Sequence, residues 1–198
     1  ISYLICHSKH ERDYNLCDNE KLINKTVVIP NGVWLEEFDS NKINKQTLYP
    51  ELSNKMWLLN VSNFFPGKGQ EHIFDILTDF PDKDKLAYIQ ISNDIEFQIG
   101  EMLENKWKVM ASKLSKSGLS VKLKKNLPRE HVIGFLKQSN VFVCTSEKEV
   151  APLVLLESMA SSLPWIATNV GNALDLQGGT CIKAVKNSRF HCVFDQRV

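Results

Sequence analysis

The stretch NVFVCTSEKEVAPLVLLESMASSLPWIA, residues 140–167, contains one complete strand–helix–strand unit. Its apolar runs at Asn140–Cys144 and Pro164–Ala167 predict strands, and the segment Leu153–Ser161 between them predicts a helix. Two such strands run parallel when a crossover helix connects them. The stretch therefore predicts part of a parallel β-sheet.

The same alternation extends toward the N-terminus. It predicts strands at Trp57–Val61, Leu86–Ile91 and Leu119–Leu123 and helices at Gln70–Phe80, Ile95–Lys116 and Arg129–Gln138. Apolar strands that alternate with crossover helices are typical of a sheet covered on both faces, so we expect a doubly wound, Rossmann-like α/β fold. Ligands of such sheets bind beyond the carboxyl ends of the strands. We therefore expect chemistry in the loops after Val61, Ile91, Leu123, Cys144 and Ala167.

The first 33 residues have a different pattern. Strands are predicted at Tyr3–Cys6 and Thr26–Pro30, a helix at Lys9–Cys17, and a turn at Asn31-Gly32. The stretch from Asp39 to Pro50 is polar and rich in Asn and Lys. We place a domain boundary near residue 34, so that residues 1–33 are a trailing segment of another domain with its linker and residues 34–198 form the sheet domain.

Composition excludes several classes of function. The formal charge is +1, from 24 basic and 23 acidic residues, which argues against a nucleic-acid partner. The longest apolar runs, such as Pro152–Leu156, are too short to span a bilayer, and no secretion signal is evident. The cysteines are odd in number and scattered, as a reducing cytoplasm would favour: Cys6, Cys17, Cys144, Cys181 and Cys192.

Two carboxylates, Glu149 and Glu157, lie eight positions apart around the predicted helix start. If Pro152 is the first helical residue, Glu149 lies in the loop and Glu157 about one and a half turns into the helix. Both would then face one ligand, and the unpaired N–H groups of the helix start offer a diphosphate site. Taken alone, each glutamate reads better as a solvated surface acid. Glu157, however, stands in an otherwise apolar helix, where an acid needs a partner such as a ligand hydroxyl.

Glu149 and Glu157, with Pro-Leu-Val-Leu-Leu between them, resemble the E-x7-E signature of family 4 glycosyltransferases. Three further stretches resemble motifs of that family and occur in the family's order. Ile29–Val33 resembles its interdomain I-P-N-G-V segment, and Ser62–Gly69 resembles its first phosphate loop, which ends in Lys-Gly. Leu163–Gly171 resembles its L-P-V-I-A-T-x-V-G strand and turn. Four motifs in order are a strong signal.

The resemblance implies a GT-B architecture, in which two Rossmann-like domains face each other and the C-terminal one binds the nucleotide sugar. It implies that Lys68 holds the diphosphate, Glu149 binds hydroxyls of the donor sugar and Glu157 those of the ribose, with Lys68 and Glu149 as the catalytic residues. The full implied donor-binding set is Asn63, Gly67, Lys68, Glu149, Ala151, Pro152, Leu153 and Glu157. No metal or cofactor is implied, and the donor would be a UDP-sugar or GDP-sugar.

The implied reaction is transfer of a hexose-type sugar to an acceptor hydroxyl with retention at the anomeric carbon, as in the synthesis of polysaccharide, lipid-linked glycan or small glycosides. The acceptor, a glycan, lipid or small molecule, would bind mainly to the other domain, which would also make any peripheral membrane contact. We therefore expect the 198 residues alone to be inactive.

Several positions depart from the family pattern. Asn63 stands where the family usually has an arginine as a second phosphate ligand, which predicts a weaker grip on the diphosphate. Val150 stands where a glycine usually follows the first glutamate, and valine would resist unusual backbone angles there. Asn172 and Asp175 are milder changes in the G-G-x-x-E turn.

Three alternatives are weighed against this interpretation. A dinucleotide-dependent oxidoreductase would share the fold, but no predicted strand is followed by G-x-G-x-x-G. A non-catalytic, nucleotide-sugar-binding partner subunit stays open because of Asn63 and Val150. Asp82-Lys83-Asp84 matches the D-x-D metal motif of the other major glycosyltransferase fold, but it lies away from the expected ligand edge and reads as a solvated turn. The five histidines show no metal-ligand spacing: His7, His10, His72, His131 and His191.

Overall fold

The computed structural model describes residues 3–10, 12–94 and 97–182. His191, Cys192 and the expected helix start at Ile95 lie outside these residues. The described part contains a six-stranded sheet with the strand order β5-β4-β3-β6-β7-β8, in which every pairing is parallel. The strands are β3 (Met56–Val61), β4 (Leu86–Ser92), β5 (Ser120–Lys125), β6 (Val141–Cys144), β7 (Trp165–Thr168) and β8 (Gly179–Ile182).

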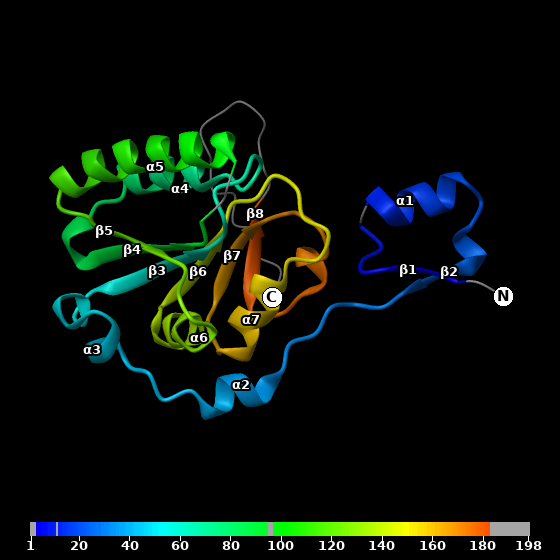
Figure 1. The fold of residues 1–198 in the computed structure, drawn as a ribbon, viewed down its shortest axis with the longest axis horizontal. Coiled ribbons are helices and arrows are strands. Elements are labelled where there is room, and N and C mark those ends of the chain that lie inside the picture. The colour runs from blue at the N-terminus through cyan, green and yellow to red at the C-terminus, as the bar shows by residue number, and fades with distance from the viewer. Residues whose placement is uncertain (1–2, 11, 95–96, 183–198) are drawn as a thin grey trace.

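Helices cover both faces of this sheet (Figure 1). Helices α4 (Gln70–Thr78) and α5 (Gln98–Lys116) lie on one face, where Phe74 and Trp107 are buried against β4. Helices α6 (Arg129–Gln138) and α7 (Leu153–Ala160) lie on the other, where Trp57 and Phe135 belong to a second core. Two apolar layers, one on each face, confirm the predicted doubly wound α/β fold.

The strand order reverses between β3 and β6. From β3 the chain moves outward through β4 to β5, and it then returns to the other side of β3 to form β6, β7 and β8. The loops that follow β3 and β6 therefore leave the sheet in opposite directions. Such a reversal opens a crevice at the carboxyl ends of the strands, which is where open α/β sheets bind ligands.

The polar segment before β3 is folded onto α6. It contains helices α2 (Leu35–Ser40) and α3 (Lys45–Leu48) and the 3₁₀ turn η2 (Pro50–Leu52), none of which the sequence pattern predicts. Phe38 is almost fully buried, and Ile43 lies so close to Gly134 of α6 that a Cβ there would come within 2.8 Å of it. A few apolar side chains therefore hold this Asn- and Lys-rich segment against the domain.

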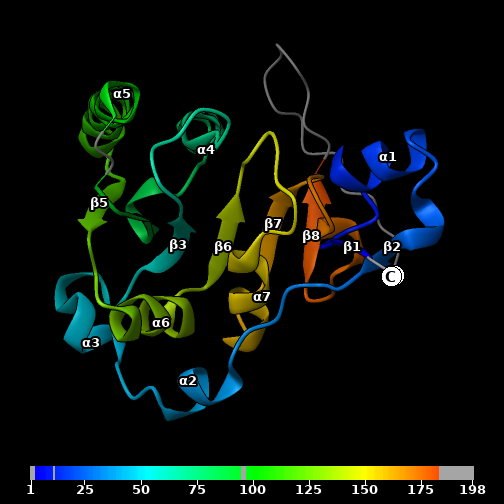
Figure 2. The same cartoon turned by 45° about the vertical axis from the view of Figure 1, so that its right-hand side comes forward.

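The N-terminal part forms a separate two-stranded parallel sheet, seen beside the larger sheet in Figure 2. It comprises β1 (Leu4–Cys6), α1 (Arg12–Asn19), the 3₁₀ turn η1 (Ile23–Lys25) and β2 (Thr26–Val28). Polar contacts with the larger part include two side chains: the ring Nε2 of His10 lies 3.1 Å from Asp175 Oδ1, and Asn31 Nδ2 donates to the carbonyl of Ala151 at 3.0 Å. The division near residue 34 stays a prediction.

Element ends differ from the expected ones by a few residues. Helix α7 begins at Leu153, because Pro152 has an extended ψ of 107° and acts as the N-cap, not as the first helical residue. Strand β7 begins at Trp165, not at Pro164, and β8 is an additional edge strand. Among the described helices, none combines the length and apolar character needed to cross a membrane.

Candidate functional site

A pocket of about 480 Å³ lies at the carboxyl edge of the sheet, where the strand order reverses. Its walls come from the loops after β3, β4, β5 and β6 and from the first turns of α7. Polar and charged residues in these walls include Ser62, Asn63, Lys68, Ser92, Asn93, Arg129, Ser146, Glu149 and Glu157. Chemistry was expected in these loops from the parallel sheet alone.

Six of the eight predicted donor-binding residues line this pocket: Asn63, Lys68, Glu149, Pro152, Leu153 and Glu157. Gly67 and Ala151 are not among its lining residues. The carbonyl of Gly67 instead accepts a hydrogen bond from the N–H of Glu147 at 2.7 Å, and the carbonyl of Ala151 accepts one from Asn31. These two residues therefore shape the loops around the pocket.

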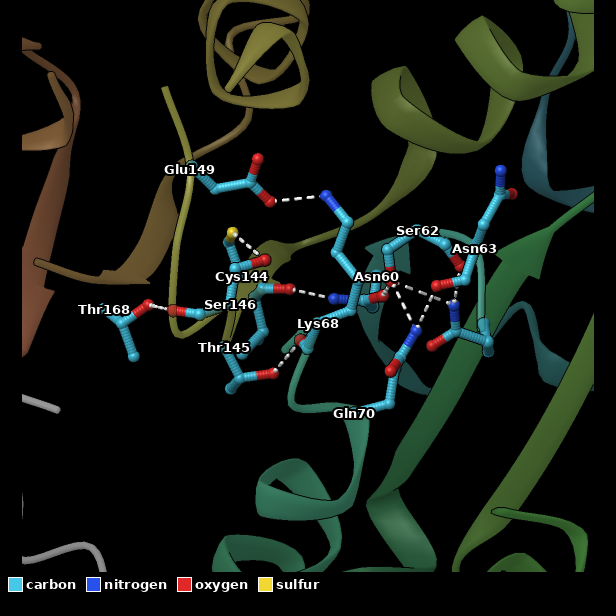
Figure 3. A network of polar contacts seen from close by, with 12 residues as sticks. Asn60, Ser62, Asn63, Lys68, Gln70, Cys144, Thr145, Ser146, Glu149 and Thr168 are labelled. Atoms are coloured by element: carbon cyan, nitrogen blue, oxygen red, sulfur yellow. Dashed lines mark hydrogen bonds and ion pairs between the residues drawn. The ribbon is translucent and has the colours of Figure 1, made fainter. Parts of the chain in front are cut away.

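Lys68 and Glu149, which both line the pocket, form an ion pair. Lys68 Nζ donates to Glu149 Oε1 at 2.6 Å, and the two side chains point toward each other in Figure 3. The lysine is 30% and the glutamate 17% exposed, so the pair is only partly hydrated. The contact joins residues 81 positions apart, one after β3 and the other after β6.

The loop that carries Lys68 reaches Glu149 because a glycine allows close packing. Gly69 has a φ of +65°, and a Cβ at this position would lie 2.2 Å from the carbonyl oxygen of Thr145. Only glycine adopts this backbone angle at little cost and also fits this contact. The phosphate-loop motif therefore packs directly on the backbone of the loop after β6.

Two buried glutamines, Gln70 (labelled in Figure 3) and Gln90, hold the start of the same loop through hydrogen bonds. Gln70 donates to Ser62 Oγ at 3.0 Å and to the carbonyl of Asn63 at 2.8 Å, and Gln90 donates to the carbonyl of Ser62 at 2.9 Å. Asn63 Oδ1 in turn accepts the N–H of Asn93, in the loop after β4, at 2.9 Å. Asn63 therefore joins two loops of the pocket, a role that comparison with the family motif does not reveal.

Glu157 has a protein partner inside the pocket. Arg129 Nη1, at the first residue of α6, donates to Glu157 Oε1 at 2.5 Å, and Arg129 Nε donates to Glu37 Oε2 at 3.1 Å. Burial alone would lower the pKa of Arg129, but the charge of Glu157, its hydrogen bond and the contact with Glu37 raise it. The partner that an acid in this apolar helix requires is thus an arginine, whereas the sequence alone suggested a ligand hydroxyl.

Arg129 is the site residue that sequence reasoning missed. It stands in one of the loop regions where parallel-sheet topology directs a search, a few residues after β5. A basic residue at that place was the available signal. Its pairing with Glu157, 28 positions later, depends on how α6 packs beside α7.

The charged side chains that line the pocket balance one another. Lys68 and Arg129 supply two positive charges, and Glu149 and Glu157 supply two negative ones. The start of α7 also borders the pocket, through Leu153 and Val154. Because the N-terminus of a helix favours anions, this end of the pocket suits a phosphate.

The structure also shows the surroundings of Val150 and of the Asp82-Lys83-Asp84 motif. Val150 has no positive φ, so the angles that a valine would resist are not adopted there. Asp82-Lys83-Asp84 lies at the 3₁₀ turn η3 (Lys83–Lys85), directly before β4 and thus at the edge opposite the pocket, as predicted for a turn. Within the described ranges, no group of three or more His, Cys, Asp or Glu side chains is arranged to hold a metal.

The family model for glycosyl transferases group 1 matches residues 41–178, which include the whole pocket. The chain belongs to the group 1 glycosyltransferases. It is 29% identical over 189 residues to the uncharacterized glycosyltransferase MJ1178 of Methanocaldococcus jannaschii, a match that covers 93% of this chain and 46% of the relative. The chain thus spans about half the length of this relative.

Solved glycosyltransferase structures share the fold. Anabaena HepE in complex with UDP matches with a TM-score of 0.77 and 18% identity, over 92% of this chain and 50% of that one. A glycosyltransferase from Rickettsia africae matches with a TM-score of 0.76 and 20% identity, over 92% and 49%. WaaG, involved in lipopolysaccharide biosynthesis, matches with a TM-score of 0.69 and 19% identity, over 91% and 49%. The predicted family and GT-B-type α/β architecture are confirmed.

Proposed function

We propose that this chain is the nucleotide-sugar-binding half of a retaining glycosyltransferase, which transfers a sugar from a nucleoside diphosphate sugar to an acceptor hydroxyl. The observation that carries the proposal is the pocket at the reversal of strand order, which gathers Lys68, Glu149 and Glu157 in a group 1 glycosyltransferase. Structures of HepE with UDP and with UDP-glucose support a nucleotide-sugar donor.

The contact between Lys68 and Glu149 supports one assignment of the pocket residues to the groups of such a donor. In a nucleoside diphosphate sugar, the diphosphate lies between the ribose and the sugar. Lys68 and Glu149 are adjacent, as the diphosphate and the sugar are, and Glu157 lies on α7 beyond the helix start. We therefore assign Lys68 to the diphosphate, Glu149 to sugar hydroxyls and Glu157 to ribose hydroxyls.

We propose that donor binding breaks the ion pair between Lys68 and Glu149. A diphosphate competes with the carboxylate for the lysine ammonium, and the carboxylate then becomes available to accept hydrogen bonds from the sugar. An ammonium beside the diphosphate also stabilises the negative charge that develops as the bond between sugar and phosphate breaks. Lys68 would thus contribute both to binding and to the chemical step.

Retention of the anomeric configuration and the requirement for a facing acceptor domain belong to the proposal. A structure of trehalose-6-phosphate synthase, studied for glycosyl transfer with retention, has a TM-score of 0.66 and 19% identity with this chain, which supports this stereochemistry. The residues that line the pocket all belong to the sheet domain. We accordingly propose that the chain alone binds the donor but does not transfer the sugar.

Isothermal titration calorimetry of the chain with UDP, GDP and NAD tests the proposal. We expect UDP or GDP to bind with modest affinity and NAD to give no heat. Lys68→Ala should lose most of the binding, whereas Lys83→Ala, at the opposite edge of the sheet, should bind like the unmodified chain. The absence of heat with every nucleoside diphosphate, or equal losses in both variants, would refute the proposal.

A further inference from the structure

Arg129 lines the pocket but has no role in the function proposed above. Its guanidinium is held from two sides: Nη1 donates to Glu157 on α7, and Nε donates to Glu37 on α2. Its Cζ also lies 5.6 Å from the ring centroid of Phe38, which is almost fully buried. An arginine fixed by two carboxylates and a ring has a defined orientation, because its planar fork fits these partners simultaneously.

Arg129 is poorly suited to bind phosphate itself. It stands between two carboxylates, so its single positive charge is already more than compensated by Glu37 and Glu157. Lys68, by comparison, has one ion-pair partner, Glu149, among the described contacts. An incoming diphosphate therefore gains more from Lys68 than from Arg129.

The hydrogen bond from Arg129 instead acts on Glu157, whose side chain is only 13% exposed. Oε1 of this carboxylate accepts the hydrogen bond from Arg129, which fixes the carboxylate on α7. A carboxylate has lone pairs on both oxygens, so it accepts further hydrogen bonds in this fixed orientation. Vicinal hydroxyl groups are matching donors.

We propose that Arg129 is a positioning residue that orients the Glu157 carboxylate toward the ribose hydroxyls and thereby makes the pocket selective for nucleotides that carry them. The inference rests on the proposed function, since it assumes that a nucleoside diphosphate occupies the pocket. It assigns to Arg129 an effect on recognition of the ribose and no direct contact with the phosphates.

The test compares the affinity of the 198-residue chain for UDP with its affinity for 2′,3′-dideoxyuridine diphosphate, which has the same base and phosphates but no ribose hydroxyls. The unmodified chain should prefer UDP by roughly ten- to a hundredfold, the range expected for charged hydrogen bonds. Arg129→Met should reduce this preference toward unity by weakening UDP more than the dideoxy analogue. Adding Glu157→Gln to Arg129→Met should not lower the preference for UDP further, because both substitutions remove the same recognition.

Lys137→Met is the matched control. Lys137 is also a cation of α6; it donates to the carbonyl of Phe38 in α2 and to that of Asn41, directly after α2, but it does not line the pocket. Its removal should leave the preference for UDP unchanged. If Arg129→Met does not fold, as judged by circular dichroism, Arg129→Lys serves instead: one ammonium lacks the planar fork that holds both carboxylates, so the preference should fall below that of the unmodified chain.

The outcomes separate the two proposals. An equal loss of affinity for both nucleotides in Arg129→Met would show that Arg129 contacts the phosphates or only supports the fold, and would overturn the inference. A preference that is unchanged in Arg129→Met, or in Arg129→Lys where that variant is used, would also overturn it while leaving the proposed function intact. Failure of the unmodified chain to bind UDP at all would refute the proposed function, and the inference with it.

Discussion

Replacement of Gly69 by alanine should destabilise the protein much more than the same replacement at Gly67, two residues earlier. Both glycines have a positive φ, +65° and +85°, so alanine at either position costs about 1–2 kcal/mol in backbone conformation. At Gly67 nothing lies within 4 Å of the added Cβ. At Gly69 the Cβ would lie 2.2 Å from Thr145 O, whereas ordinary contact begins at 3.4 Å, so two backbone segments must separate by about 1 Å.

Overpacking of this kind costs about 1–3 kcal/mol more. We therefore expect a loss of about 2–5 kcal/mol in the free energy of unfolding for Gly69→Ala and about 1–2 kcal/mol for Gly67→Ala. Urea unfolding followed by circular dichroism measures both values, and UDP titration of the folded variants shows whether the displaced loop still presents Lys68. Equal destabilisation by the two variants would refute the inferred packing of the phosphate loop on the loop after β6.

Three further predictions concern the carboxylates and Asn63. In calorimetric titrations, Glu149→Gln should leave UDP affinity nearly intact but abolish any gain from the sugar of UDP-glucose, whereas Glu157→Gln should weaken both ligands by about 1–3 kcal/mol; the reverse pattern would refute the assigned roles. Asn63→Arg should tighten UDP binding by a factor that decreases as the salt concentration rises. Loss of binding with an intact fold would show that the hydrogen bond from Asn93 to Asn63, which connects two loops of the pocket, matters more than added charge. Burial acts to raise the pKa of Glu104, but hydrogen bonds from two lysines lower this pKa below its ordinary value of 4.5. The ionised carboxylate therefore stabilises the fold above pH 4.5, and this stabilisation is lost as the pH falls through the lowered pKa. Glu104→Gln should therefore cost up to about 1 kcal/mol in urea unfolding at neutral pH and nothing in strong acid, and a cost that persists in acid would contradict this assignment.

Much of the fold is predictable because its strands are buried on both faces. The strand Leu86–Ser92 is buried at every residue, and its sequence is mostly apolar on both faces, with Gln90 and Ser92 as its polar members. The edge strand Gly179–Ile182 is short and mixed in character, and only its pairing with β7 makes it a strand. The helices at Leu35–Ser40 and Lys45–Leu48 are too short to show a helical period and depend on packing against α6.

The candidate site likewise contains residues that the sequence predicts and one contact that it does not. Glu149 and Glu157 are visible in the sequence because one strand-to-helix segment carries both, and Lys68 is visible because glycines flank it. The side chain of Arg129 reaches Glu157 only through the packing of α6 beside α7. Contacts between loops that are distant in the sequence therefore remained for the structure to reveal.

A crystal structure of the chain with UDP would test the central claim most directly. We predict that the diphosphate lies within hydrogen-bonding distance of Lys68 Nζ at the start of α7, with the ribose hydroxyls at the carboxylate of Glu157. UDP bound elsewhere, or bound in this pocket with its phosphates away from Lys68, would contradict the assignment of the pocket as the nucleotide-sugar site.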